Sequence, residues 1–197
     1  MGKPNALRRD LMREQLAHQA ARIMAEEGVA DFAFAKRKAA KQLGAADTQH
    51  LPSNEEIEIA LHTYRALYQS DTHPDILREL REEALAAMQV FAEFNPYLTG
   101  SVLSGSAGED SDINLMLFSD DAKAVLLSLL KNNIDFEDGE WRIRIGGHDE
   151  IVPSYTLTGE SSALIHIIVL PENMRHSGSR HPETHADITA VETLLAG

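Results

Sequence analysis

A glycine-containing turn that leads into a strand with alternating polar residues constrains this chain more than any other feature. The run Leu98-Thr99-Gly100-Ser101 is separated by ten residues from Asp112-Ile113-Asn114-Leu115. Glycine accepts positive φ and lets the backbone come close to a ligand, and the Ser101 amide at a helix start offers an N–H donor to a phosphate. Because residues two apart on a strand point to the same face, the pattern predicts that Asp112 and Asn114 lie side by side next to the turn.

The stretch PYLTGSVLSGSAGEDSDINLMLF, residues 96 to 118, resembles the signature of the DNA polymerase beta-like nucleotidyltransferase superfamily. In that signature a strand ends in Gly-Ser, a short turn and helix follow, and the next strand carries Asp-x-Asp. The two carboxylates hold the magnesium ions that clamp an in-line phosphoryl displacement. Here the second carboxylate is replaced by Asn114. The resemblance implies a nucleotide-binding turn at Gly100 and Ser101, with Asp112 and Asn114 at the catalytic positions.

The third metal ligand of the superfamily is a carboxylate in a later apolar strand that often ends in proline. The only run of that form here is ALIHIIVLP, residues 163 to 171, which places His166 where the acid should be. The resemblance therefore extends over residues 97–171 and implies a metal site of Asp112, Asn114 and His166, in which two of three carboxylates are replaced. The alternative is that His166 is a strand residue whose ring nitrogens hydrogen-bond to neighbouring groups.

These replacements affect the expected cofactor and activity. A neutral imidazole favours Zn, Mn or Fe over Mg, which prefers oxygen ligands, and one aspartate neutralises little of the charge of two metal ions. The loop acids Glu109 and Asp110 are alternative ligands. We therefore expect a nucleotidyltransferase-fold protein with a degenerate active site, which binds a nucleotide or a protein partner without catalysis and needs no cofactor. The alternative is an active enzyme that uses Mg or Mn to transfer NMP from an NTP to a hydroxyl acceptor.

The composition limits which binding partners and which cellular compartment we expect. The chain has 197 residues, no cysteine and a formal net charge of −13, so disulfides and thiolate zinc sites are excluded. The negative charge opposes strong binding to nucleic acid. The basic residues that cluster in one predicted helix, Lys36, Arg37, Lys38 and Lys41, fit a solvated helical face. No uninterrupted apolar run reaches the ~18 residues of a membrane span, and we expect a cytoplasmic protein without membrane contact.

The periodicity of apolar residues divides the chain near residues 95 and 96. Apolar residues at helical spacing predict helices over residues 5–27, 31–43 and about 74–94, and Ser53 with Glu56 predicts a capping box at the start of another. Beyond residue 95 we expect strands near 97–100, 112–118, 140–145, 151–157 and 163–170, with a hairpin turn at Asp138-Gly139. We also expect one helix from about 119 to 131 and a short helix near 185–195. The predicted fold is α+β: a helical domain (1–95) followed by a nucleotidyltransferase-like mixed sheet flanked by helices (96–197).

Overall fold

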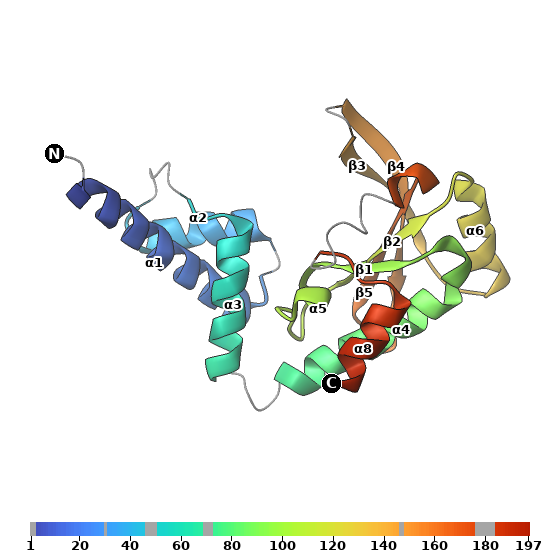
Figure 1. Cartoon of the computed structure of the whole chain (residues 1–197), viewed down its shortest axis with the longest axis horizontal. Coiled ribbons are helices and arrows are strands. Elements are labelled where there is room, and N and C mark those ends of the chain that lie inside the picture. The colour runs from blue at the N-terminus through green and yellow to red at the C-terminus, as the bar shows by residue number, and fades with distance from the viewer. Residues whose placement is uncertain (1–2, 30, 46–50, 69–72, 146–147, 176–183) are drawn as a thin grey trace. The chain divides into compact units, whose positions relative to one another are not determined.

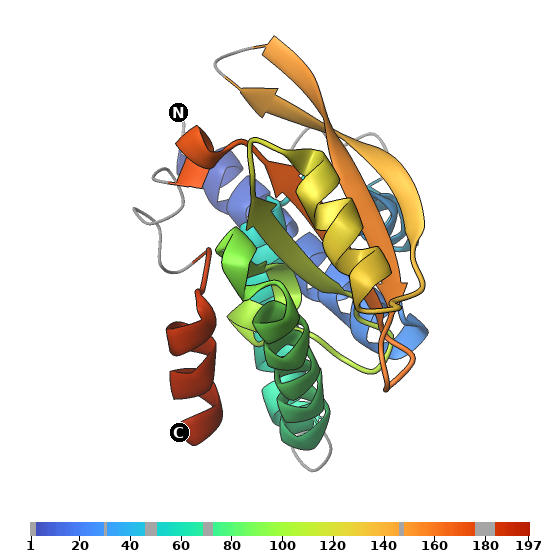
Figure 2. The ribbon, with the colours of Figure 1, turned by 90° about the vertical axis from the view of Figure 1, so that its right-hand side faces the viewer.

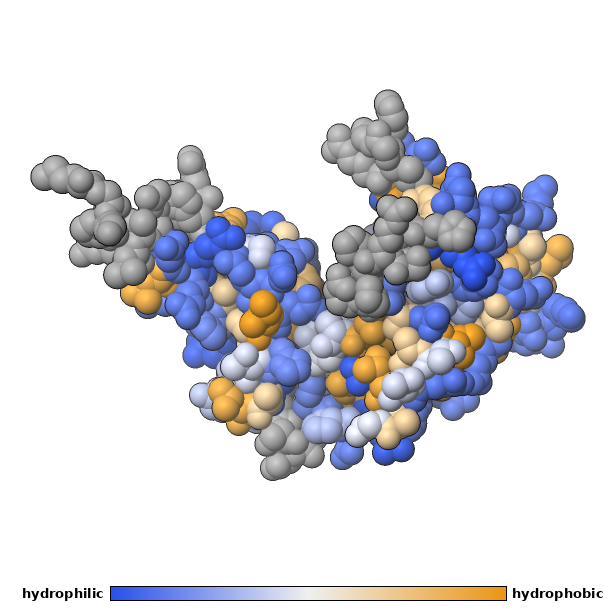
Figure 3. Space-filling model, in the orientation of Figure 1, coloured by the Kyte–Doolittle hydropathy of each residue, from blue (hydrophilic) through white to orange (hydrophobic). Residues whose placement is uncertain are grey.

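The computed structural model describes residues 3–29, 31–45, 51–68, 73–145, 148–175 and 184–197 (Figure 1). Contacts between Cα atoms divide the chain into two compact units. Residues 1–74 and 108–110 form one, which we call the helical unit, and residues 75–107 and 111–197 form the other, the sheet unit. The surface seen in Figure 3 is mostly hydrophilic, as the net charge of −13 leads one to expect.

In its described residues the helical unit contains the helices α1 (Lys3–Glu27), α2 (Phe32–Gln42) and α3 (Asn54–Tyr68). Gly28, at φ +63°, follows the last residue of α1 and adopts the left-handed conformation that ends many helices. The Asp31 side chain accepts hydrogen bonds from the amides of Ala33 and Phe34 and so caps α2. The core of this unit is built from apolar residues of all three helices, among them Leu16, Ala20, Ile23, Ala39, Ile57 and Leu61.

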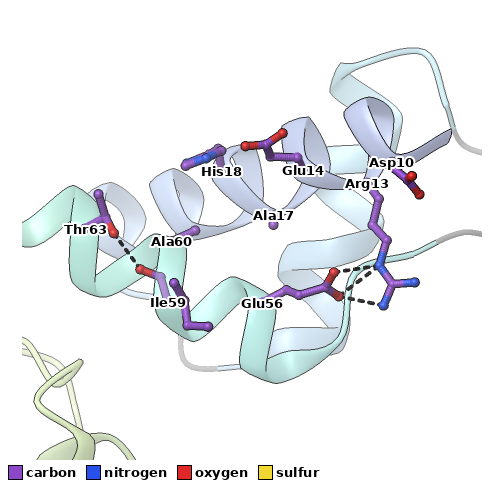
Figure 4. Close-up of a pocket in the computed structure, with 9 residues that line it drawn as sticks. All are labelled: Asp10, Arg13, Glu14, Ala17, His18, Glu56, Ile59, Ala60 and Thr63. Carbon is purple, nitrogen blue, oxygen red and sulfur yellow. Dashed lines mark hydrogen bonds and ion pairs between the residues drawn. The ribbon is translucent and has the colours of Figure 1, made fainter. Parts of the chain in front are cut away.

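The predicted capping box at the start of α3 is confirmed. The Ser53 amide donates to Glu56 Oε2 at 2.6 Å, and the Glu56 amide donates to Ser53 Oγ at 3.1 Å. Arg13 of α1 adds a forked pair, with its Nε 2.8 Å from Glu56 Oε1 and its Nη2 2.7 Å from Glu56 Oε2 (Figure 4). Arg13 is the main cause that lowers the pKa of Glu56 to about 2, and the Ser53 amide adds to the effect.

The lowered pKa of Glu56 makes the stability of the helical unit depend on pH. The ionised Glu56 carboxylate contributes to the free energy of unfolding. This contribution is fully present above the ordinary carboxyl pKa of about 4.3 and is lost as pH falls through about 2. We expect Glu56→Gln to destabilise the unit at pH 7 by less than about 1 kcal/mol, because the pair is part exposed. The deficit should shrink as pH falls from about 5 towards 2. Urea unfolding followed by circular dichroism across this range measures it.

The control for that experiment is Glu14→Gln, which removes a carboxylate that lines the same pocket (Figure 4) but does not bond Arg13. If the loss of unfolding free energy in Glu56→Gln stays constant down to pH 2, the ionised Glu56 carboxylate does not stabilise the unit.

The sheet unit is built on a five-stranded sheet in the order β1-β2-β5-β4-β3. The strands are β1 (Tyr97–Thr99), β2 (Ile113–Phe118), β3 (Glu137–Ile145), β4 (His148–Thr158) and β5 (Leu164–Leu170). Strands β2 and β5 are parallel, whereas the other neighbours are antiparallel. The sheet is therefore mixed, and the predicted α+β class is confirmed. Among the described residues, no helix is both long and apolar enough to cross a membrane.

One face of this sheet is buried under helices. Helices α4 (His73–Val90) and α6 (Ala122–Lys131) lie on the same side of it (Figure 2). Met88 of α4 and Phe91 are fully buried in one core cluster with alternate residues of the central strands, among them Leu115, Leu117, Ile165 and Ile167. Burial of such a side chain contributes about 1.5–3 kcal/mol. The opposite face carries a smaller apolar cluster around Phe118, Val152 and Leu170.

Two features differ from the sequence expectation. The predicted hairpin turn at Asp138-Gly139 is wrong, because both residues lie inside β3 and pair with Tyr155 and Ser154 of β4. The pairing of β3 with β4 instead continues to Ile145 and His148. The division of the chain by contacts falls between residues 74 and 75 rather than 95 and 96, because α4 packs its apolar face into the core of the sheet unit.

Candidate functional site

A row of polar side chains crosses the sheet on the face opposite α4 and α6. The strand register pairs Thr99 with Asn114, Asn114 with His166, and His166 with Thr156, and Thr156 pairs in turn with Glu137. Directly paired residues share a face, so the five side chains lie on one side of the sheet. The next row on that face is apolar on β1, β2 and β5, where it contains Tyr97, Met116 and Ile168, and it continues with Ser154 on β4. On β1, β2 and β5 the polar side chains are thus confined to one end of the face.

Asp112, just before β2, joins this row through His166. Its Oδ2 lies 3.3 Å from His166 Nε2, and Thr156 Oγ1 lies 3.2 Å from His166 Nδ1. The side chains of Asp112 and His166 are 39% and 38% exposed, so a ligand can reach both. The structure therefore brings together Asp112, Asn114 and His166, the three residues that the sequence proposed as a metal site.

Gly100 lies directly beside the row. It adopts φ +74°, and a Cβ built on it would meet Asn114 Nδ2 at 3.3 Å. Ser101 is in the first turn of α5 (Gly100–Ser104), whose first N–H groups have no acceptor within the helix. The Thr99 hydroxyl does not cap this helix and donates instead to the carbonyl of Asn114 at 3.3 Å. Because α5 has only five residues, its dipole is small, and any phosphate contact at Ser101 would rest on individual N–H donors.

Arg81 of α4 fixes the far end of α5, a function that sequence analysis did not anticipate. Its Nε donates to the carbonyl of Val102 at 3.0 Å, and its Nη2 donates to the carbonyl of Leu103 at 3.1 Å. Burial lowers the pKa of Arg81 from its ordinary value. Since the carbonyls at a helix end lack hydrogen-bond donors within the helix, the guanidinium supplies donors to two of them and so fixes the C-terminal end of α5.

Replacement of Gly100 tests how tightly the turn is fitted to the row. We expect Gly100→Ala to destabilise the sheet unit by about 1–3 kcal/mol, because alanine is strained at positive φ and its Cβ would press on Asn114. Urea unfolding followed through the fluorescence of Trp141, the only tryptophan, measures the change. Ser101→Ala, one residue on, is the control and should have little effect. Equal losses in both variants would show that the positive φ is not the cause.

The residues of the row do not fit a two-magnesium site. Across the described parts of the chain, no group of three or more His, Cys, Asp or Glu side chains is placed to hold a metal ion. Among Asp112, Asn114 and His166, Asp112 supplies the one carboxylate, and its Oδ2 faces an imidazole nitrogen. The other acid of the row, Glu137, is separated from His166 by Thr156. The alternative ligands Glu109 and Asp110 group with the helical unit, where the Asp110 carboxylate lies against Gly28. Hard divalent cations need more oxygen ligands than this set provides.

A pocket lies in the helical unit and is lined by side chains of α1 and α3, including the charged or titratable Asp10, Arg13, Glu14, His18 and Glu56 (Figure 4). Its best-defined contact is the Arg13–Glu56 pair, which joins the two helices. We therefore assign this pocket a structural role.

Comparison with known proteins identifies no close relative. No family model matches the chain, and no curated protein matches it. Among solved structures, the Cid1 poly(U) polymerase with bound MgGTP aligns over 55% of this chain and 38% of its own length, at 17% identity and a TM-score of 0.34. The aligned part is well under half of that polymerase. A similarity this low does not establish a common fold, so any function has to rest on the residues of the site.

Proposed function

We propose that the sheet unit is a nucleotidyltransferase-like domain that binds a nucleoside triphosphate and no longer transfers NMP. The observation that supports this best is the contact between Asp112 and His166, 3.3 Å apart. It lies at the positions where the superfamily signature has two of its three metal-binding carboxylates. An imidazole that hydrogen-bonds to the remaining carboxylate takes up the space and the oxygen atom that a metal ion would need.

Loss of catalysis follows from the charges of phosphoryl transfer. The protein contributes little covalent chemistry to this reaction, and its main contribution is to hold metal ions that neutralise charge in the transition state. A single carboxylate, with a neutral amide at Asn114 beside it, holds such ions poorly. The predicted catalytic positions Asp112 and Asn114 are therefore proposed to have lost that function.

Nucleotide binding is supported by hydrogen-bond donors beside Gly100 and along the polar row. The Ser101 amide, the Asn114 side-chain amide and the Thr156 hydroxyl are donors that suit phosphate oxygens. Glycine at position 100 keeps the approach to Asn114 free of a side chain. The part-exposed His166 lies between Asn114 and Thr156, and its two ring nitrogens contact Asp112 and Thr156, so the ring positions both side chains.

The sign of one mutational effect tests this proposal. In a site that binds phosphates without metal, the Asp112 carboxylate repels the ligand, so Asp112→Asn should tighten NTP binding by about 1 kcal/mol, roughly fivefold. In a metal-dependent site the same variant should abolish binding. Isothermal titration of ATP, GTP, CTP and UTP, in EDTA and in Mg²⁺, separates the two. His166→Ala should weaken metal-free binding about tenfold, because it removes the ring that positions the Thr156 hydroxyl and contacts Asp112.

The matched control is Thr158→Ala, which removes a threonine two residues from Thr156 on the same strand but outside the polar row. Absence of binding to all four nucleotides in both EDTA and Mg²⁺ would refute the nucleotide proposal.

A further inference from the structure

The long edge of the sheet, strand β3, has no neighbour on its outer side among the described residues. It pairs with β4 over nine successive residues, Glu137 to Ile145, and is the last strand in the sheet order. The opposite edge is protected differently. Strand β1 has only three residues, and Leu98 exchanges backbone hydrogen bonds with Ala186. An unpaired strand edge is a template for another strand, so β3 is the edge at which a partner strand can add.

The part of β3 around Trp141 also pairs with a stretch of β4 that lies beyond the pairing of β4 with β5. Strand β4 pairs with β5 only over Ser154–Thr158, whereas its pairing with β3 continues back to His148. The hairpin therefore projects past the rest of the sheet as a two-stranded ribbon (Figure 2). Trp141 is 55% exposed on this ribbon and Ile151 is 60% exposed. An isolated two-stranded ribbon is marginally stable, and a third strand would stabilise it.

The charge pattern of β3 specifies which strand fits. Its sequence is EDGEWRIRI, with acidic residues before Trp141 and basic residues after it. If two copies of this strand pair antiparallel about Trp141, Glu140 of each copy faces Arg142 of the other. Opposite charges directly across an antiparallel pair stabilise it, and like charges destabilise it. A parallel pairing in register would instead oppose like charges at every one of these positions.

We propose that two copies of this protein associate through their β3 strands, in an antiparallel register centred on Trp141, to form one continuous sheet across a twofold axis. Such an interface is isologous, with the same residues on both sides. It does not depend on the nucleotide site, because the polar row reaches β3 only at Glu137, at the far end of the strand. A contact through one strand edge is smaller than a standard interface of about 1,600 Å², so the dimer should form in a concentration-dependent way.

Sedimentation velocity over a range of protein concentrations tests the association directly, with the full chain. Trp141 provides a second readout, because it is the only tryptophan and lies at the proposed centre. We expect its emission to shift to the blue, and its quenching by acrylamide to fall, over the same concentrations at which the dimer appears. A monomer at all concentrations, or a dimer that leaves Trp141 emission and quenching unchanged, would overturn the proposal.

Charge reversal tests the register. Glu140→Arg places like charges opposite each other at two symmetric positions, and so does Arg142→Glu. Each variant alone should raise the dissociation constant at least about tenfold, since each unfavourable pair replaces a favourable one. An equimolar mixture of the two should associate again, because both pairs across a mixed dimer are then complementary. The double variant Glu140→Arg/Arg142→Glu should also self-associate.

These outcomes separate the proposed pairing from misfolding and from other modes of association. A variant that had merely unfolded would not be rescued by mixing, and circular dichroism checks each one. If the single variants associate as well as the natural chain does, or if the mixture stays monomeric, the β3 register is refuted.

Discussion

Replacement of both Asn114 and His166 with aspartate should create a site for a divalent metal ion in the sheet unit. The register places residues 114 and 166 directly opposite each other on neighbouring strands, and Asp112 lies within 3.3 Å of His166. Three carboxylates would then converge on one point of the sheet face. The attraction between unit charges 4 Å apart near a protein surface is about 4 kcal/mol. Even if desolvation and repulsion remove half of this for each added carboxylate, the gain in affinity for Mn²⁺ or Mg²⁺ should reach at least about 100-fold.

Isothermal titration calorimetry with each metal measures this gain. The control is Asn114→Ala/His166→Ala, which removes the same side chains without adding charge. Without metal, the double aspartate variant should be less stable than the control, because three like charges repel one another, and Mn²⁺ should restore its stability. Equal metal affinity in the two double variants would show that the row is no longer arranged as a metal site.

Features set by neighbours in sequence could be predicted from the chain alone. The capping box depends only on Ser53 and Glu56, three residues apart, and the structure confirms it. The proximity of His166 to Asp112 was implied by the resemblance of two short motifs, and the structure places the two side chains in contact.

Features set by pairing between distant segments were missed. Thr99, Thr156 and Glu137 belong to the polar row because of strand register, and no local pattern reveals register. Asp138-Gly139 has the composition of a hairpin turn, yet pairing with β4 holds both residues in a strand. The apolar face of α4 was visible in the sequence, but its spacing alone could not tell which of two cores it joins. In each case the missing information is a contact between segments remote in sequence.

The natural chain should show no transfer of NMP above background. Loss of metal-binding carboxylates removes several kcal/mol of transition-state stabilisation, and ~1.4 kcal/mol corresponds to tenfold in rate. With Asn114 and His166 at two of three positions, any residual rate should be ~10³-fold or more below that of an intact site. Purified protein with Mg²⁺ or Mn²⁺, α-labelled NTPs and candidate hydroxyl acceptors, including the protein's own, measures this rate.

Label that appears in the natural chain and disappears in Asp112→Ala would establish the alternative, an active metal-dependent enzyme. His166→Ala and Glu109→Ala would then show which side chain supplies the missing ligand, because only loss of the true ligand should lower the rate. If the double aspartate variant binds Mn²⁺ and also gains transfer activity, the geometry of the site has survived and only its charge was lost. If it binds Mn²⁺ without gaining activity, the metal position has survived, but the arrangement that aligns nucleotide and acceptor has not, since a metal ion accelerates transfer only when the reacting groups are held in line.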